Sequence, residues 1–383
     1  MPAHPTYLDH ASTTPLRPEA RAALDAHLGA ANASSAHLAG QDARAALEEA
    51  REHVATELGC APSELVFTSG ATEANNLAVK GVLWAAREQG RSHLVVSAVE
   101  HPAVLEPARW LAERGEARLS VVPPAPDGRV EVERVLDAVE PDTALVSVMA
   151  ANNEVGAVND VAALGAGLAD TPVALHCDAV QAVSTRRVDV GGWGVDALSL
   201  SAHKLGGPQG VGVAVLRRDL PVTPLTHGGG QDRGVRSGTF AVALDVALAA
   251  ALRAAAADRD DLDTRLRALS QRLADGATDL EGVHRNGPDE AAWRLSSHVH
   301  LSLEAADPDA LRLELDRAGL AASTGSACAS GAGHASPVVE ACGITGTPLR
   351  LSLGWTSTEE DVDHALEVLA DVVPRVRLRL SLS

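Results

Sequence analysis

The stretch Leu65-Val-Phe-Thr-Ser-Gly-Ala-Thr-Glu-Ala-Asn-Asn76 begins the pattern that decides the fold. Its first four residues are apolar or β-branched and predict a strand, and the residues from about Glu73 to Arg87 predict a helix. A second strand at 93–97 and a second helix from about Ala103 to Glu113 follow. Alternating strands and helices of this kind are typical of a mostly parallel sheet covered by helices on both faces.

The alternation continues toward the C-terminus and then changes character. Further strands are predicted at 144–149, 173–177, 197–201 and, antiparallel, 210–216. One long Ala-rich helix over 242–273 is expected to lead into a smaller α+β unit. That unit is predicted to contain strands at 298–303 and 349–353, a helix at 309–318 and a closing helix from Glu359. We therefore predict an α/β protein with a large domain at 15–250 and a small domain formed by 1–14 with 251–383.

The composition is that of a globular protein and argues against several classes of partner. Hydrophobic residues make up 46% of the chain, charged residues 22%, and the formal net charge is −19. A surface with this much negative charge repels phosphate backbones, and we therefore expect no broad nucleic-acid-binding surface. The N-terminus lacks a signal pattern, and Asp245 and Arg253 interrupt the most apolar run, 241–257. A cytoplasmic protein without a membrane span is therefore expected.

Lys204 follows the strand predicted at 197–201, at the edge where sheets of this kind bind ligands. It is one of two lysines, the other being Lys80, in a chain whose other basic residues are arginines. Arginine stays protonated and forms no Schiff base, so such a chain must keep a lysine wherever an imine is needed. We predict that Lys204 is a Schiff-base lysine, and an ordinary surface lysine is the alternative.

Two other strand ends carry groups that suit a phosphorylated pyridine cofactor. Asp178 follows the strand at 173–177, where a carboxylate would meet a ring nitrogen, and Gln181 one turn later would reach a phenolic oxygen. The segment 68–73 joins a strand to a helix through small residues, and its N–H groups with Thr72 would suit a phosphate. Asp178 could equally be a helix N-cap. Together with Lys204, these groups predict pyridoxal 5′-phosphate (PLP).

His101 and Arg350 are ambiguous when each is taken alone. His101 follows another strand, where an imidazole could cover a cofactor ring and move protons, or simply begin the next helix. Arg350 lies on an otherwise apolar strand and needs a carboxylate partner. That partner could be a substrate carboxylate or an internal Asp or Glu.

Four cysteines are present, and their spacing indicates neither a disulfide framework nor a zinc site. Cys328 lies in a segment rich in Gly, Ser and Ala, 323–334, which predicts an exposed loop with a reactive thiol. Cys60, Cys177 and Cys342 lie where small inert hydrophobic residues are expected. Cys328 is therefore the candidate nucleophile, although a cysteine in such a loop is more often not catalytic.

The chain resembles the cysteine desulfurases, a group within the class V aminotransferase superfamily of PLP enzymes. The resemblance runs almost from end to end and depends on the order and spacing of many short motifs. The motifs are Tyr7-Leu-Asp-His-Ala-Ser-Thr-Thr-Pro15, Phe67-Thr-Ser-Gly-Ala-Thr-Glu73, Glu100-His101, Asn152-Asn-Glu-Val-Gly156, Asp178-Ala-Val-Gln181, Ser201-Ala-His-Lys204, His227-Gly-Gly-Gly-Gln231, Arg236-Ser-Gly-Thr239, Gly325-Ser-Ala-Cys328 and Leu349-Arg-Leu-Ser-Leu-Gly354.

The resemblance implies the fold-type I architecture of PLP-dependent transferases and a role for each matching residue. Lys204, Cys328 and His101 would be catalytic, with Cys328 carrying a persulfide. Asn153 and Arg350 would bind the substrate, and Thr239 would come from the other subunit of a homodimer. The implied cofactor-binding residues are Ala71, Thr72, His101, Asp178, Gln181, Ser201, His203, Lys204 and Thr239.

The activity implied by the resemblance is removal of sulfur from L-cysteine, which gives L-alanine and a persulfide on Cys328. A protein acceptor would then take the sulfur: a tRNA-thiolation enzyme, an iron–sulfur scaffold or a DNA-phosphorothioation system. A selenocysteine lyase or another class V aminotransferase would also use Lys204 and Asp178. A non-catalytic sulfur-relay scaffold is the alternative from a different functional class.

Overall fold

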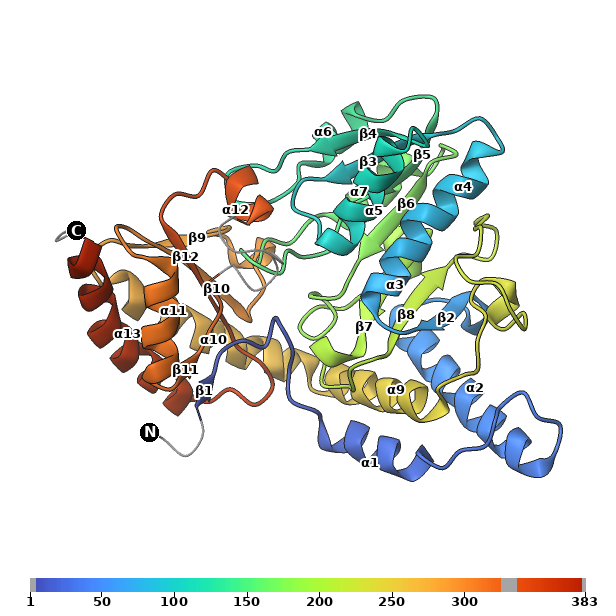
Figure 1. Cartoon of the computed structure of the whole chain (residues 1–383), viewed down its shortest axis with the longest axis horizontal. Coiled ribbons are helices and arrows are strands. Elements are labelled where there is room, and N and C mark those ends of the chain that lie inside the picture. The colour runs from blue at the N-terminus through green and yellow to red at the C-terminus, as the bar shows by residue number, and fades with distance from the viewer. Residues whose placement is uncertain (1–4, 325–335, 381–383) are drawn as a thin grey trace.

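The computed structural model describes residues 5–324 and 336–380 and has the predicted α/β architecture (Figure 1). Its main sheet has seven strands in the order β2-β8-β7-β6-β5-β3-β4. Within it β8 runs antiparallel to β2 and β7, and the other pairs are parallel. The strands are β2 (Leu65–Thr68), β3 (His93–Ser97), β4 (Arg118–Val122), β5 (Thr143–Ser147), β6 (Ala174–Asp178), β7 (Ala197–Ser201) and β8 (Gly212–Leu216).

The central strands are almost continuously apolar because helices cover the sheet on both sides. On β3, Leu94 and Val96 join a buried cluster with α4 and α5, whereas Val95 joins the cluster that contains α2, α7 and α9. The helices associated with this sheet are α1 (Pro18–His27), α2 (Leu38–Leu58), α3 (Ala71–Asn76), α4 (Val82–Arg87), α5 (Pro102–Glu113), α6 (Val132–Asp137), α7 (Val161–Leu168), α8 (Val190–Trp193) and α9 (Val242–Ala257).

A second, smaller unit has its own apolar core. Its antiparallel sheet has the order β12-β10-β9, and β1 pairs in parallel with β11, so the N-terminal strand belongs to this unit. Figure 1 shows both chain ends on this side of the molecule. The elements are β1 (Thr6–Tyr7), β9 (Val283–Asn286), β10 (His298–Leu303), β11 (Leu320–Ala321), β12 (Thr347–Ser352), α10 (Arg259–Thr278), α11 (Pro308–Arg317) and α13 (Glu359–Leu380). The short helix α12 (Pro337–Ala341) instead packs Val338 against the core of the larger unit.

The single helix predicted over 242–273 is wrong, because the chain forms two helices, α9 and α10. The break is at Asp258, whose φ of −105° and ψ of 5° are not helical. The Asp258 carboxylate accepts two hydrogen bonds from the Arg17 guanidinium, at 2.9 and 3.2 Å. This contact with a residue far away in the sequence accompanies a turn that no Gly or Pro marks.

The helix predicted over 73–87 is present from Ala71 to Arg87, but its middle turn, Leu77–Gly81, is a π-helix. The Gly81 carbonyl there accepts a hydrogen bond from the Thr223 N–H at 3.0 Å. A Cβ on Gly81 would lie 2.6 Å from Val222 Cγ1, so the close approach of segment 222–223 requires glycine. Of the helices that the structure describes, none is long and apolar enough to cross a membrane.

Candidate functional site

A cavity of about 640 Å³ opens beyond the carboxyl ends of β3, β6 and β7. Parallel strands place the residues that follow them at one edge of the sheet, so side chains far apart in the sequence meet there. The N-terminal segment 9–13 and Arg350 of the smaller unit complete the wall. Ten of the predicted site residues line the cavity: Ala71, Thr72, His101, Asn153, Asp178, Gln181, Ser201, His203, Lys204 and Arg350.

Lys204 ends a short 3₁₀ turn, Ala202–Lys204, directly after β7. Its Nζ donates hydrogen bonds to the carbonyl oxygens of Ala11 and Ser12, both at 2.6 Å. Gln181 Nε2 donates to the same Ala11 carbonyl at 3.0 Å. Lys204 is therefore not an ordinary surface lysine: two backbone carbonyls hold its amine at the cavity wall.

Asp178 is the last residue of β6 and only 4% exposed. Its Oδ2 accepts from Asn75 Nδ2 at 2.7 Å, and its Oδ1 accepts from the Val180 N–H at 3.0 Å. The bond to Val180 gives Asp178 a local role in the turn that follows β6. The carboxylate also lines the cavity, so the turn-forming and ligand-facing interpretations are compatible.

The segment predicted to hold a phosphate leads from β2 into α3. Gly70 precedes α3 with a φ of +151°, a conformation that favours glycine, and a Cβ there would lie 3.9 Å from Ser201 Oγ. No described side chain caps the first turn of α3. His203 also lines the cavity, and burial and the nearby Lys204 lower its pKa to about 4. The start of α3, Ser201 and a neutral imidazole therefore line the same cavity.

His101 begins α5, where its Nδ1 accepts a hydrogen bond from the Ala103 N–H at 3.0 Å. Burial is the main cause that lowers the pKa of His101, Lys204 lowers it further, and Asp178 opposes both. The residue thus has the helix-start role that we considered, and it also faces the cavity. Its imidazole is neutral at neutral pH.

Arg350 has an internal partner, which answers the question that its sequence position left open. Its Nη2 donates to Asp9 Oδ1 and to Ser12 Oγ, both at 2.8 Å, and its Nη1 donates to the Asn153 carbonyl at 2.9 Å. Arg350 is 4% exposed, and its Nε has no hydrogen-bond partner among the described residues. The guanidinium is held in place at the cavity wall by Asp9, a residue that the sequence reasoning did not consider.

Two predicted residues are not in this wall. Thr239 is exposed and does not line the cavity of its own chain. Cys328 lies outside the described residues. Burial raises the pKa of the other thiols, to about 12 for Cys60, to about 11 for Cys342 and well above the usual value for Cys177. These three thiols are protonated at neutral pH and therefore poor nucleophiles.

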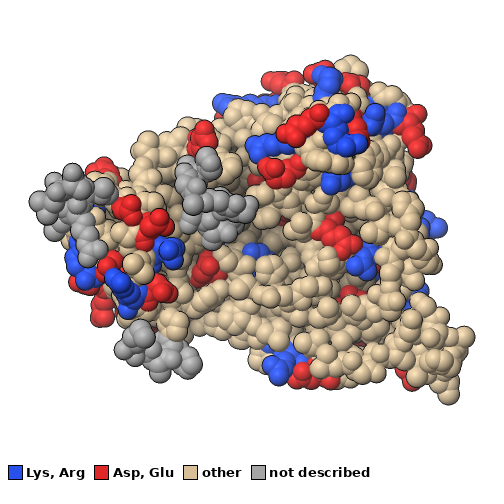
Figure 2. Space-filling view, in the orientation of Figure 1, with Lys and Arg blue, Asp and Glu red and all other residues tan. Residues whose placement is uncertain are grey.

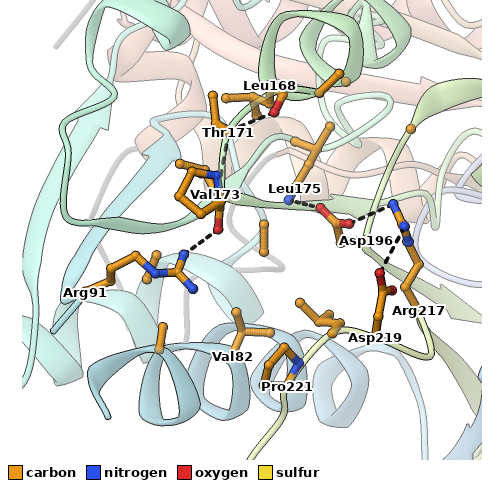
Figure 3. A pocket seen from close by; sticks show the side chains of 18 residues that line it. Val82, Arg91, Leu168, Thr171, Val173, Leu175, Asp196, Arg217, Asp219 and Pro221 are labelled. Carbon is orange, nitrogen blue, oxygen red and sulfur yellow. Dashed lines mark hydrogen bonds and ion pairs between the residues drawn. The ribbon is translucent and has the colours of Figure 1, made fainter. Parts of the chain in front are cut away.

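A second cavity, of about 370 Å³, lies where β5 and β6 begin (Figure 3). Arg217 pairs with Asp196 and Asp219 at 3.2 and 3.3 Å, and Figure 3 shows the Arg91 guanidinium pointing to the chain before Val173. The charged side chains that line this second cavity thus bind one another or the backbone. No cluster of three His, Cys, Asp or Glu side chains suited to a metal occurs in residues 5–324 and 336–380. The larger cavity is the candidate site.

Comparisons with known proteins identify relatives of this chain. The family model described as aminotransferase class-V matches residues 6–365. An "IscS-like cysteine desulfurase" of Mycobacterium tuberculosis is 45% identical and is matched over 97% of each chain. A solved "NIFS-LIKE PROTEIN" superposes with a TM-score of 0.90 at 32% identity, covering 97% of this chain and 100% of that one. "SspA in complex with cysteine" gives a TM-score of 0.79 at 30% identity, covering 91% and 98%.

Proposed function

This chain belongs to the aminotransferase class-V family as a PLP-dependent cysteine desulfurase, and we propose that Lys204 holds its cofactor and Cys328 accepts its sulfur. The observation that carries the proposal is the meeting of Lys204, Asp178 and Arg350 in one cavity. These three groups suit an aldehyde, a ring nitrogen and an amino-acid carboxylate, respectively.

The residues around the cavity fit PLP. Two donors orient the buried Asp178 carboxylate, which would face a protonated ring nitrogen. The open first turn of α3 at Ala71 and Thr72, with Ser201 and His203, would hold the phosphate. Gln181 would contact the ring oxygen, and His101 would lie against the ring. When bound, PLP supplies an electron sink for the carbanion at the substrate α-carbon.

Substrate cysteine would be held and activated by the residues of this chain. The Arg350 guanidinium would bind the cysteine carboxylate, and Asn153 would contact substrate oxygens. The Lys204 amine would remove the proton from the α-carbon, and the neutral imidazole of His101 can accept a proton. Asp9 would keep Arg350 correctly oriented before the substrate arrives.

Sulfur transfer would take place between two sulfur atoms. The Cys328 thiolate attacks the sulfur of the bound cysteine, a sulfur–sulfur bond forms, and the carbon–sulfur bond of the substrate breaks. The electron pair of that bond stays on the substrate carbon, which takes up a proton to become the methyl group of alanine. The products are alanine and a persulfide on Cys328. A protein acceptor then takes the outer sulfur: an iron–sulfur scaffold, a tRNA-thiolation enzyme or a DNA-phosphorothioation system.

The same proposal extends to the organisation of the protein. We place the enzyme in the cytoplasm as a homodimer, in which Thr239 of each subunit reaches the cofactor of the other. Its exposure and its absence from the cavity of its own chain support this role. Residues 15–250 would form the cofactor domain, and residues 1–14 with 251–383 the domain that carries Cys328.

Alanine release from cysteine tests the proposal. Lys204→Ala should abolish both alanine release and the visible absorbance of the cofactor. Cys328→Ser should abolish alanine release and persulfide formation but keep that absorbance. Cys60→Ser is the matched control and should behave like the wild type, because the Cys60 thiol is protonated at neutral pH. Cysteine-dependent alanine release by Cys328→Ser at the wild-type rate would refute the role of Cys328.

A further inference from the structure

Glu100 lies behind the wall of the proposed site, and none of the proposed reaction steps involves it. It immediately precedes His101 and is 1% exposed. Its Oε1 accepts a hydrogen bond from Ser97 Oγ at 2.8 Å and another from the Met149 N–H at 2.6 Å. One carboxyl oxygen therefore joins the end of β3 to the segment that follows β5.

The segment bound by Glu100 also holds the end of β6. The Ala150 N–H, next to the Met149 N–H, donates to the Asp178 carbonyl at 2.8 Å. Asn152 Nδ2 donates to the Val99 carbonyl at 3.0 Å, which fixes the turn before His101 a second time. Residues 149–152 thus bind the turn that leads to His101 on one side and the backbone of Asp178 on the other.

The surroundings of Glu100 favour its uncharged form. Burial is the main cause that raises its pKa, the nearby Asp178 raises it further, and the pKa is about 8 despite the two hydrogen bonds. Its Oε2 is buried and has no hydrogen-bond partner among the described residues. The titratable groups that face it are Asp178 and Cys177 on β6, and burial keeps the Cys177 thiol protonated.

We propose that Glu100 is a positioning residue that acts as an uncharged carboxylic acid, holding His101 and Asp178 in place without adding a second buried negative charge. This inference rests on the proposed function, because the placing of His101 and Asp178 matters only if they serve the cofactor. A carboxylate at this position would repel the Asp178 carboxylate that the cofactor ring requires. A neutral acid keeps the same two hydrogen bonds without that repulsion.

Glu100→Gln tests the charge state, because an amide keeps an accepting oxygen and cannot ionise. The folded protein holds the Glu100 proton up to a pH of about 8, whereas the unfolded chain releases it near 4.5. Wild-type stability therefore falls as pH rises through this interval. The melting temperature of the Glu100→Gln holoenzyme, relative to the wild type, should rise over the same interval. A difference that stays constant with pH would overturn the proposal.

The positioning role is tested by cofactor binding and turnover. Glu100→Gln should keep kcat within about twofold of the wild type at neutral pH, and at higher pH it should retain cofactor absorbance and kcat that the wild type loses. Glu100→Ala should lower cofactor affinity and kcat by about tenfold or more. If Glu100→Gln loses as much as Glu100→Ala, the uncharged-acid role is wrong. Equal kcat and cofactor affinity in Glu100→Ala and the wild type would exclude any positioning role.

Asp245→Asn is the matched control, because Asp245 on α9 is 2% exposed and burial raises its pKa to about 7, yet it does not line the cavity. This variant should change the pH dependence of the melting temperature and leave cofactor affinity unchanged. An equal loss of cofactor affinity in Asp245→Asn and Glu100→Ala would show that changing any buried acid has this effect, against a special role for Glu100. The melting and cofactor-binding measurements do not depend on cysteine turnover, so they separate failure of this inference from failure of the proposed function.

Discussion

Asn75 controls how the carboxylate of Asp178 is presented to the cavity. It is fully buried on α3, and its Nδ2 provides the side-chain hydrogen bond to Asp178 Oδ2. A buried carboxylate that loses a donor is left partly unsatisfied, which costs more than the hydrogen bond itself contributes. The orientation of the Asp178 carboxylate therefore depends on a neighbour that makes no contact with solvent.

We expect Asn75→Ala to lower the free energy of unfolding by about 1–3 kcal/mol and to weaken PLP binding. The physical reason is the lost donor to Asp178, which also leaves the carboxylate free to turn. Titration of the apoenzyme with PLP and a denaturant melt would measure the two effects. Asn76→Ala is the control, because the Asn76 side chain donates to the Thr72 carbonyl within its own helix. Equal PLP affinity in Asn75→Ala and the wild type would contradict this account.

Lys204, Asp178 and Arg350, three of the predicted site residues, share one property: each lies on or directly after a recognisable strand. Lys204 and Asp178 lie at or just after the ends of apolar strands, and the parallel-sheet rule brings such positions together. Asn75 and Asp9 have no such signal, because their importance comes from partners 103 and 341 residues away. Because Asp9 is so far from Arg350 in the sequence, the sequence indicated that Arg350 needs a carboxylate partner but not which residue provides it.

At the scale of secondary-structure elements, the start of α3 is tied to a distant segment through Glu73. Glu73 Oε2 accepts from the Ser69 N–H at 2.6 Å, and Glu73 Oε1 accepts from Arg236 Nε at 2.9 Å. Burial alone would raise the pKa of Glu73, but the hydrogen bonds from Arg236 and Ser69 outweigh it and lower the pKa. The loop proposed to hold the phosphate is thereby anchored to the segment that leads to Thr239.

Glu73→Gln should destabilise the protein by about 1 kcal/mol at neutral pH, because the pair with Arg236 is partly exposed. A depressed pKa contributes stability above the pKa of the unfolded chain, and that contribution disappears as pH falls through the folded value. The melting temperatures of variant and wild type should therefore differ at pH 7 and converge as the pH falls below 4.5, the ordinary pKa of this carboxyl. Glu49→Gln, at an exposed position on α2, is the control. A difference unchanged between the two pH values would rule out the ion-pair explanation.

Most elements were predictable because their apolar periodicity is strong, as in β3, β6 and β7. The errors occur where a distant residue determines a local conformation. Asp258 carries no turn signal, and the end of α9 coincides with its contact to Arg17, 241 residues away. The π-helical turn in the predicted helix 73–87 accompanies the approach of Thr223 to Gly81. Secondary-structure propensity depends on residues that are close in the sequence, so it cannot predict conformations that contacts with distant residues determine.

For the molecule as a whole, the surface suggests how two copies would meet. Figure 2 shows few charged side chains over much of the lower half of this face, where Figure 1 places α1 and α9. Leu28, which follows α1, is 69% exposed, and Leu38, which begins α2, is 78% exposed. A face with few charges and two exposed leucines fits a contact between two copies, as in the homodimer that we propose.

If Thr239 serves the site of the partner subunit, two inactive variants should complement each other in a hybrid dimer. Thr239→Asp should weaken PLP binding, because a carboxylate would repel the phosphate, and Lys204→Ala should be inactive. In a hybrid dimer of one subunit of each kind, the site with an intact Lys204 would receive an intact Thr239 from its partner. We expect purified hybrids, made by co-expression with two affinity tags, to recover about half of the wild-type alanine release per dimer. If Thr239 served the site of its own chain, neither site in the hybrid would be complete and mixing would restore nothing.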